Sequence, residues 1–149
     1  MTVKVIVKEN LDIYIIESLP IKKEFIHLYK EATSEWSSQG LYTYDELYRA
    51  ICNSWYCVSI YHDTRLIGFG RIISDGIYQT LICDVMVLPE YQNHGVGAKI
   101  METLLNKCDE KGIKWVQLLS AGGKQGFYEK FGFTARDAGS PGMTLFFDN

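Results

Sequence analysis

The stretch "PEYQNHGVGAKIM", residues 89–101, decides how the rest of the chain is interpreted. Two glycines, Gly95 and Gly97, stand between an apolar run that ends at Pro89 and a helical pattern that follows. The first N–H groups of a helix have no partner within the helix, and that end carries a partial positive charge. Glycines there allow the backbone to approach an anion closely. Three interpretations follow: a nucleotide-binding loop, a cradle for the phosphates of another ligand, or a tight turn without a ligand.

Two nucleotide-binding patterns are tested directly by the residues that surround the glycines, and both fail. A dinucleotide fold requires G-x-G-x-x-G, but Ile100 occupies the third glycine position. A P-loop requires a lysine followed by Ser or Thr after its last glycine. Neither Ala98-Lys99 nor the second glycine-rich stretch, "AGGKQG" at 121–126, provides that pair. For the glycine pair alone, a tight turn without a ligand and a binding site are about equally expected. The surrounding sequence must therefore decide between them.

The composition predicts one globular domain over residues 1–149 with a sizeable core, because 47% of the chain is apolar. The net charge is −3 and there is no basic run, which argues against nucleic acid as a partner and mildly favours amine-bearing partners. The first ten residues lack the features of a signal peptide, and no run is long and apolar enough to span a bilayer. A cytoplasmic protein without a membrane partner is therefore expected.

The cysteines and histidines predict neither disulfides nor a metal site. No two cysteines form a C-x-x-C pair, and the histidines have no metal-ligand spacing. Buried, reduced thiols are the better interpretation. The residues concerned are Cys52, Cys57, Cys83, Cys108, His27, His62 and His94.

Hydrophobic periodicity predicts a mostly antiparallel mixed sheet with helices on both faces. Strands are expected at 3–7, 12–16, 55–61, 65–74, 79–88, 113–120 and 142–148. Helices are expected at 21–32, 44–54, 95–112 and the start of 125–133. Thr43 is a candidate N-cap and Gly112 a candidate C-terminal cap. Ile100, Leu104, Leu105 and Cys108 are expected to form the buried face of the longest helix.

The order of an apolar strand, Pro89, an aromatic residue and Q-x-x-G-x-G before a helix resembles the acetyl-CoA signature of the GCN5-related N-acetyltransferases (GNAT family). Residues 92–97 satisfy that signature, and "FYEKFGF" at 127–133 matches a second family element after the next strand. The resemblance covers roughly residues 56–147. It implies the GNAT fold, an α/β (α+β) arrangement with a mixed, mostly antiparallel sheet of about six to seven strands, about four helices and splayed central strands.

The resemblance also implies acetyl-CoA as the cosubstrate, without a metal. In the family, backbone N–H groups of the glycine turn hold the coenzyme's pyrophosphate, and the strand before it bonds the pantetheine through its main chain. Val85 and Val87 match the pantetheine positions, and core packing of their side chains is compatible with that role. The residues of the matching turn are Gln92, Asn93, His94, Gly95, Val96, Gly97 and Ala98.

Acyl transfer to an amine has three chemical requirements. The amine must lose a proton, since a free alkylamine has a pKa near ~10.4. The tetrahedral oxyanion needs N–H donors, for which the resemblance implies the amide of Val87. The leaving thiolate needs a proton, and Tyr128 matches the family's general acid, although an aromatic core residue is the alternative. Three neighbouring aromatic residues are expected in the core: Phe127, Phe131 and Phe133.

The general base is left open, because the strand before the turn offers Cys83 and Asp84, and a water chain that ends in bulk solvent could serve instead. Strand alternation predicts that Cys83, Val85 and Val87 share one face and that Asp84 points the other way. Asp84 is expected either to act through a water molecule or to serve as a structural acceptor. His94 is expected to meet phosphate through its backbone.

The acceptor site is expected in the first helix pair and the loop between its helices. Trp36 and Tyr42, with Tyr44, are the candidate contacts, and Glu35 and Asp45 are the candidate partners of an ammonium group. Exposed loop aromatics and solvated charges are the alternative. The resulting hypothesis is an N-acetyltransferase acting on a small-molecule primary amine, with a homodimer possible. The rivals are a non-catalytic acyl-CoA-binding or sensor module, and a structural interaction domain with an empty turn.

Overall fold

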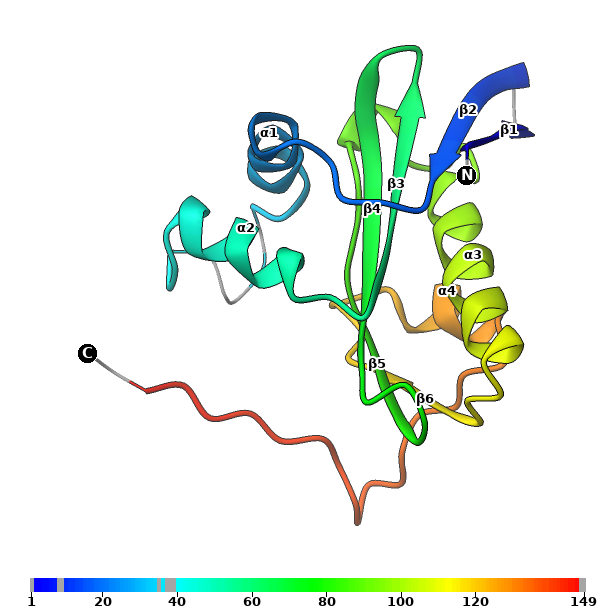
Figure 1. Cartoon of the computed structure of the whole chain (residues 1–149). Helices are drawn as coiled ribbons and strands as arrows, with labels where there is room; N and C mark the ends of the chain where they lie inside the picture. The colour runs from blue at the N-terminus through cyan, green and yellow to red at the C-terminus, as the bar shows by residue number, and fades with distance from the viewer. Residues whose placement is uncertain (1, 8–9, 35, 37–39, 148–149) are drawn as a thin grey trace. The chain divides into compact units, whose positions relative to one another are not determined.

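The computed structural model describes residues 2–7, 10–34, 36 and 40–147, and the chain forms two compact units, Met1–Leu118 and Leu119–Asn149. The first unit contains the sheet with three helices, and the second contains a short helix (Figure 1). The prediction of one domain over residues 1–149 stays a prediction. The elements are β1 (Thr2–Val7), β2 (Leu11–Ile16), α1 (Lys22–Ala32), α2 (Tyr44–Cys52), β3 (Tyr56–His62), β4 (Arg65–Ser74), β5 (Gln79–Val87), α3 (Val96–Glu110), β6 (Trp115–Leu118) and α4 (Gln125–Glu129).

The six strands of the sheet lie in the same order as in the chain, from β1 to β6. Neighbours up to β5 are antiparallel, and short connections at residues 63–64 and 75–78 join β3 to β4 and β4 to β5. The pair β5–β6 is parallel because α3 crosses between the two strands. The predicted mixed, mostly antiparallel sheet is confirmed.

Helices cover both faces of the sheet, with α3 on one side and α1 on the other (Figure 1). Alternation along β4 explains this arrangement, since Gly68 and Gly70 face α3 while the ring of Phe69 packs on Phe25 of α1 at 5.5 Å. The buried face of α3 includes Met101 and Val96, which were not predicted, whereas Leu105 is half-buried. The other buried residues of α3, Ile100, Leu104 and Cys108, are as predicted.

Two predicted helix boundaries are confirmed by their capping geometry. Thr43 and Glu46 form a capping box at the start of α2, in which Thr43 Oγ1 accepts from the N–H of Glu46 at 3.2 Å. The carboxylate of Glu46 in turn accepts from the N–H of Thr43 at 2.8 Å. Gly112 follows the last turn of α3 with a φ of 72°, a left-handed conformation that favours glycine.

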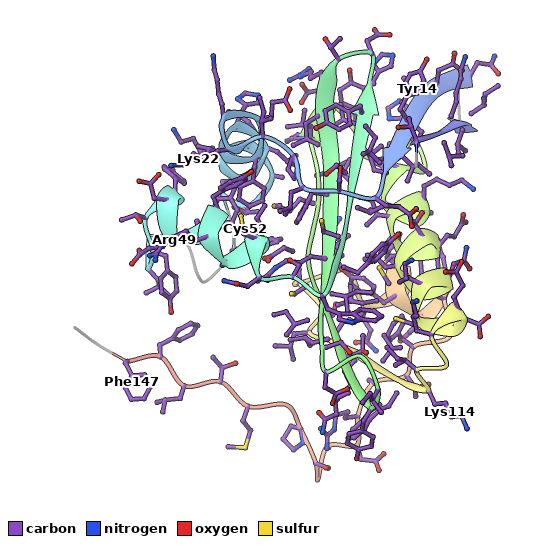
Figure 2. The ribbon with its side chains drawn as sticks, viewed as in Figure 1. Tyr14, Lys22, Arg49, Cys52, Lys114 and Phe147 are labelled. Atoms are coloured by element: carbon purple, nitrogen blue, oxygen red, sulfur yellow. The ribbon has the colours of Figure 1, made fainter. Side chains whose placement is uncertain are left out.

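The predicted strand at 142–148 is wrong for the residues that the structure describes. Residues 142–147 form no strand, and Met143, Leu145 and Phe147 are 90%, 76% and 84% exposed. Figure 2 shows Phe147 near the end of this segment. An apolar, alternating segment forms a strand only where another strand pairs with it, and the described residues of the second unit contain none. The strand start expected after the short helix is likewise absent from residues 130–133, which continue from α4 as a turn.

Close packing of α3 on β4 predicts a specific destabilising substitution. A Cβ added at Gly70 would lie 2.5 Å from Cγ2 of Ile100, and a β-branched side chain in a helix has little freedom to move away. We expect Gly70→Ala to lower the free energy of unfolding by about 1–3 kcal/mol, measured by urea denaturation. Gly122→Ala is the control, because nothing lies within 4 Å of its added Cβ. Equal unfolding midpoints for the two variants would contradict this packing.

Candidate active site

One edge of β5 is open over its last residues. The parallel pairing with β6 runs from Gln79–Trp115 to Ile82–Leu118 and ends there. Among the described strands, residues 83–87 of β5 therefore pair with β4 alone. An unpaired strand edge presents N–H and C=O groups that an extended ligand can bond as an added strand. The open edge agrees with the splayed central strands that the resemblance to the GNAT family implies.

A β-bulge lies within this open segment of β5. Phe69 pairs with Met86 and Arg71 pairs with Cys83, so β5 has one residue more than β4 over this interval. Asp84, inside the bulge, has a φ of 54°, which places a non-glycine residue in the left-handed region.

The bulge overturns the prediction that Cys83 shares a face with the two valines. Cys83 pairs with Arg71, whereas Val87 pairs with Gly68, and positions 71 and 68 of β4 project to opposite faces. Val85 lies on the α3 side, where its side chain is 3.6 Å from a Cβ built on Gly70. Counting alternate residues along the sequence cannot detect an extra residue that is defined only by pairing with the neighbouring strand.

Asp84 forms an ion pair across the bulge. Its carboxylate accepts a hydrogen bond from Nε of Arg71 at 2.5 Å, and the two side chains are 25% and 13% exposed. Nη1 of Arg71 also donates to the carbonyl of Ala50, in the last turn of α2, at 3.3 Å. Burial, and then the charge of Asp84, raise the pKa of Cys83 to about 11. The thiol beside this ion pair is therefore neutral near pH 7.

The glycine turn connects β5 to α3 through a single 3₁₀ turn, Pro89–Tyr91. Asn93 and Gly95 both have left-handed φ values, of 66° and 87°, and Gly95 is the N-cap of α3. The N–H of Lys99 bonds to the carbonyl of Gly95 and closes the first turn of the helix. The first turn of α3 carries no acidic side chain that would repel an anion. The N–H groups that precede the first intrahelical bond are those of Val96, Gly97 and Ala98.

Side chains of the turn attach it to the sheet. Nε2 of Gln92 donates to the carbonyl of Val87 at 3.2 Å, so the start of the turn is tied to the end of β5. Nδ1 of His94 lies 2.8 Å from the carbonyl oxygen of Gln92. The hydroxyl of Tyr91 lies 2.9 Å from Nδ1 of His62 on β3, which anchors the 3₁₀ turn. The sequence gives no signal for this His62–Tyr91 contact.

Arg71 is the residue of this site that sequence reasoning missed. The available signal is an arginine within the otherwise apolar strand segment "GFGRIIS", since a charged side chain is buried only when it is paired. Its partner was not predictable, because the contact with Asp84 depends on the strand register and on the bulge.

A hollow of about 230 Å³ lies beside α1 and α2, where the acceptor site was predicted. It contains Tyr42 among its lining residues, while Trp36 packs edge-on against Tyr29 at a centroid distance of 6.3 Å. Asp45 forms an ion pair with Lys22, and the hydrogen bond from Lys22 lowers the pKa of Asp45. Glu35, the other candidate ammonium partner, is outside the described residues. The lining residues are Tyr29, Gly40, Tyr42, Thr43, Tyr44 and Leu47.

Tyr128 lies in α4, in the second unit. Its ring packs edge-on against Phe127 at 5.1 Å and against Phe133 at 6.3 Å, and Phe127 in turn contacts Phe131 at 5.3 Å. The three phenylalanines were expected in the core, but their rings are half-buried and form an aromatic cluster with Tyr128. Burial raises the pKa of Tyr128, so the phenol keeps its proton at neutral pH.

The four cysteines are free thiols; the predicted burial holds for Cys57 and Cys108, whereas Cys83 is half-buried and Cys52 is exposed. Within the described ranges, no group of three or more His, Cys, Asp or Glu side chains is arranged to hold a metal ion. In that same part of the chain, no helix has the length and apolar character needed to cross a membrane.

Comparison with protein families gives a match to the acetyltransferase (GNAT) domain over residues 53–135, more than half of the chain. The chain belongs to the GNAT family. The N-acetyltransferase ycf52-like of Prochlorococcus marinus is 36% identical over 96 residues, which are 62% of this chain and 53% of that protein. The chloroplastic GCN5-related N-acetyltransferase 1 of Arabidopsis thaliana is 37% identical over 81 residues, 54% of this chain and 41% of that protein. This GNAT chain thus spans about half the length of these curated relatives.

Solved structures confirm the predicted GNAT fold. A probable acetyltransferase from meticillin-resistant Staphylococcus aureus has a TM-score of 0.77 at 25% identity, covering 91% of this GNAT chain and 99% of that one. A GNAT family acetyltransferase from Brucella melitensis, solved in complex with acetyl-CoA, has a TM-score of 0.66 at 20% identity, covering 83% of each chain. Because relatives with chloroplastic names occur, the compartment of this GNAT chain stays a prediction.

Proposed function

We propose that this chain is an N-acetyltransferase that moves the acetyl group of acetyl-CoA to a small-molecule primary amine. One observation carries the proposal: the glycine turn at the start of α3 follows directly on the open edge of β5. An open strand edge suits an extended arm that carries amide groups, and a helix N-terminus suits phosphate. Coenzyme A combines both features in one molecule.

The coenzyme would be held by backbone groups. The N–H groups of Val96, Gly97 and Ala98 would meet its pyrophosphate, and the left-handed Asn93 and Gly95 shape the turn around that position. The rest of the predicted turn, Gln92 and His94, would contribute its main chain. The main chain of Val85 and Val87 would bond the pantetheine along residues 83–87. Acetyl-CoA itself is described for the Brucella melitensis neighbour, which has the same fold.

The proposed reaction is direct attack of the neutral amine on the thioester carbonyl. A bond forms between the amine nitrogen and the carbonyl carbon, and the carbon–sulfur bond breaks. The amide of Val87 would donate to the oxyanion, and Tyr128 would give its phenolic proton to the departing thiolate. A phenol that is protonated at neutral pH suits this role. The amine would lose its proton to water, because Asp84 is already engaged by Arg71.

The amine would enter at the aromatic hollow beside α1 and α2. Tyr42 is 61% exposed at its margin, and the ring of Tyr44 already has the ammonium group of Lys30 at 4.6 Å from its centroid. Aromatic faces attract cations in this way. Trp36 would support the hollow through its contact with Tyr29.

A panel of primary amines tests the activity. Purified protein is incubated with acetyl-CoA and each amine, and free thiol is measured together with acetylated product. The proposal requires thiol and product in equal amounts for at least one amine. Stabilisation by acetyl-CoA without turnover of any amine would instead indicate a sensor module, and no stabilisation at all would indicate an empty turn.

Coenzyme binding should depend on the small residue at position 97. In Gly97→Val, a side chain occupies the first turn of α3, where phosphate must approach the backbone. Acetyl-CoA at 100 times its Kd should stabilise the unmodified chain by about 2.7 kcal/mol, and this gain should be lost in the variant. Asn106→Val is the matched control, since it places the same side chain at an exposed position further along the same helix. Calorimetry that shows unchanged affinity in Gly97→Val would exclude this pyrophosphate site.

The general-acid role of Tyr128 predicts a loss in kcat rather than in coenzyme affinity. Tyr128→Phe removes the proton donor but keeps the ring in its aromatic cluster. We expect kcat to fall by about 10²–10⁴-fold, the usual contribution of a positioned acid, with an unchanged Kd for acetyl-CoA. Tyr14→Phe on β2 (Figure 2) is the control and should leave kcat within about twofold. A normal kcat in Tyr128→Phe would rule out the acid role.

A further inference from the structure

Arg71 joins three elements of the first unit through one guanidinium group. It projects from β4, donates through Nε to Asp84 in the β5 bulge at 2.5 Å, and donates through Nη1 to Ala50 in the last turn of α2 at 3.3 Å. Its side chain is only 13% exposed. Charge-assisted hydrogen bonds to a carboxylate are stronger than neutral ones, and screening by solvent is reduced at this burial. The contacts of Arg71 therefore constrain both the bulge and the helix end.

The backbone of Asp84 depends on such a constraint. A non-glycine residue with a φ of 54° is in a sparsely populated conformation, which persists only when the surroundings hold it in place. The bulge precedes Val85 and Val87 directly, so its conformation sets the direction of their main-chain groups along the open edge. The ion pair with Arg71 is the contact that holds the carboxylate of Asp84.

The second contact of Arg71 is with α2, the helix that lines the hollow proposed for the amine. The carbonyl of Ala50 belongs to the C-terminal turn of α2, where helix carbonyls carry partial negative charge and a cation is favoured. The opposite end of α2 lines the aromatic hollow through Tyr44 and Leu47. The guanidinium group of Arg71 thus contacts both α2, which lines the aromatic hollow, and the bulge at the open edge of β5.

We propose that Arg71 and Asp84 are positioning residues, whose ion pair holds the β5 bulge and the last turn of α2 in the arrangement that binds acetyl-CoA and amine. This inference rests on the proposed N-acetyltransferase function. It assigns Asp84 no proton transfer: the carboxylate shapes the site through Arg71 and does not touch the reacting atoms.

Substitutions at Asp84 separate the conformation of the bulge from the charge. Asparagine and glycine tolerate a left-handed φ, whereas alanine does not, and asparagine also retains an oxygen that can accept from Arg71. We expect Asp84→Asn to keep kcat within about threefold and to keep the pH profile of the unmodified chain, because no proton transfer is lost. Asp84→Ala should raise KM about tenfold or more for both acetyl-CoA and the amine, since misplacing the binding groups weakens both.

Arg71→Met tests the other half of the pair. It should raise both KM values, since it removes the contact with Ala50 as well as the ion pair. The effect of the double variant should be smaller than the sum of the two single effects, because the shared ion pair is lost only once. The same cycle, measured as free energies of unfolding without coenzyme, should show coupling between the two positions. Asp12→Asn is the control, because it breaks the exposed ion pair of Asp12 with Lys4 and should leave both KM values unchanged.

Three results would overturn the inference. Loss of kcat by about 100-fold in Asp84→Asn, with unchanged KM values and an altered pH profile, would make Asp84 a general base. Additive effects in both cycles would show that the two residues do not act as a pair. Unchanged KM values in Asp84→Ala would remove the positioning role. Should Arg71→Met not fold, the comparison of Asp84→Asn, Asp84→Gly and Asp84→Ala decides alone, with glycine expected to lie nearer asparagine than alanine in KM.

The proposed function fails separately from this inference. If the unmodified chain shows neither stabilisation by acetyl-CoA nor turnover, the proposed function is wrong and the positioning role falls with it. If the unmodified chain is active and the variants at positions 71 and 84 behave like it, the inference alone is wrong.

Discussion

The structure depends on the way the pairing of β5 changes along its length. Up to Ile82 this strand has neighbours on both sides, and over residues 83–87 the described strands pair with it on one side alone. Backbone N–H and C=O groups require partners, so an edge within the sheet is a natural place for a ligand that behaves as a strand. The bulge at Asp84 lies in the same segment and sets the direction of the groups that follow.

The position of the glycine turn matters because the turn begins where the open edge of β5 ends. Gln92 bonds back to the carbonyl of Val87, and Gly95 then starts α3 in a left-handed conformation. The proposed sites for an amide-bearing arm and for phosphate are therefore consecutive in the chain. Family membership and the GNAT fold of the solved neighbours agree with this arrangement. Specificity for the acceptor would come from other elements, the helices α1 and α2.

Several local features of the fold and of the candidate site could be predicted from the sequence. The turn at 92–97, the cap at Thr43 and the left-handed Gly112 each follow from residue type and immediate neighbours, and each is present. The larger failures involve pairing between strands. The bulge reverses the expected face of Cys83, since it exists only in the register of β4 with β5. The strand predicted at 142–148 lacked a partner in its unit, and the ion pair of Arg71 with Asp84 depends on that same register.

The claim that coenzyme A lies along the open edge of β5 is tested most directly by hydrogen exchange of the backbone amides, with and without acetyl-CoA. The account predicts slower exchange in two segments at once, residues 83–87 and residues 92–98, because the pantetheine bonds the first and the pyrophosphate bonds the second. Protection of the turn with unchanged exchange in residues 83–87 would contradict it, since the coenzyme would then be bound by its phosphates alone.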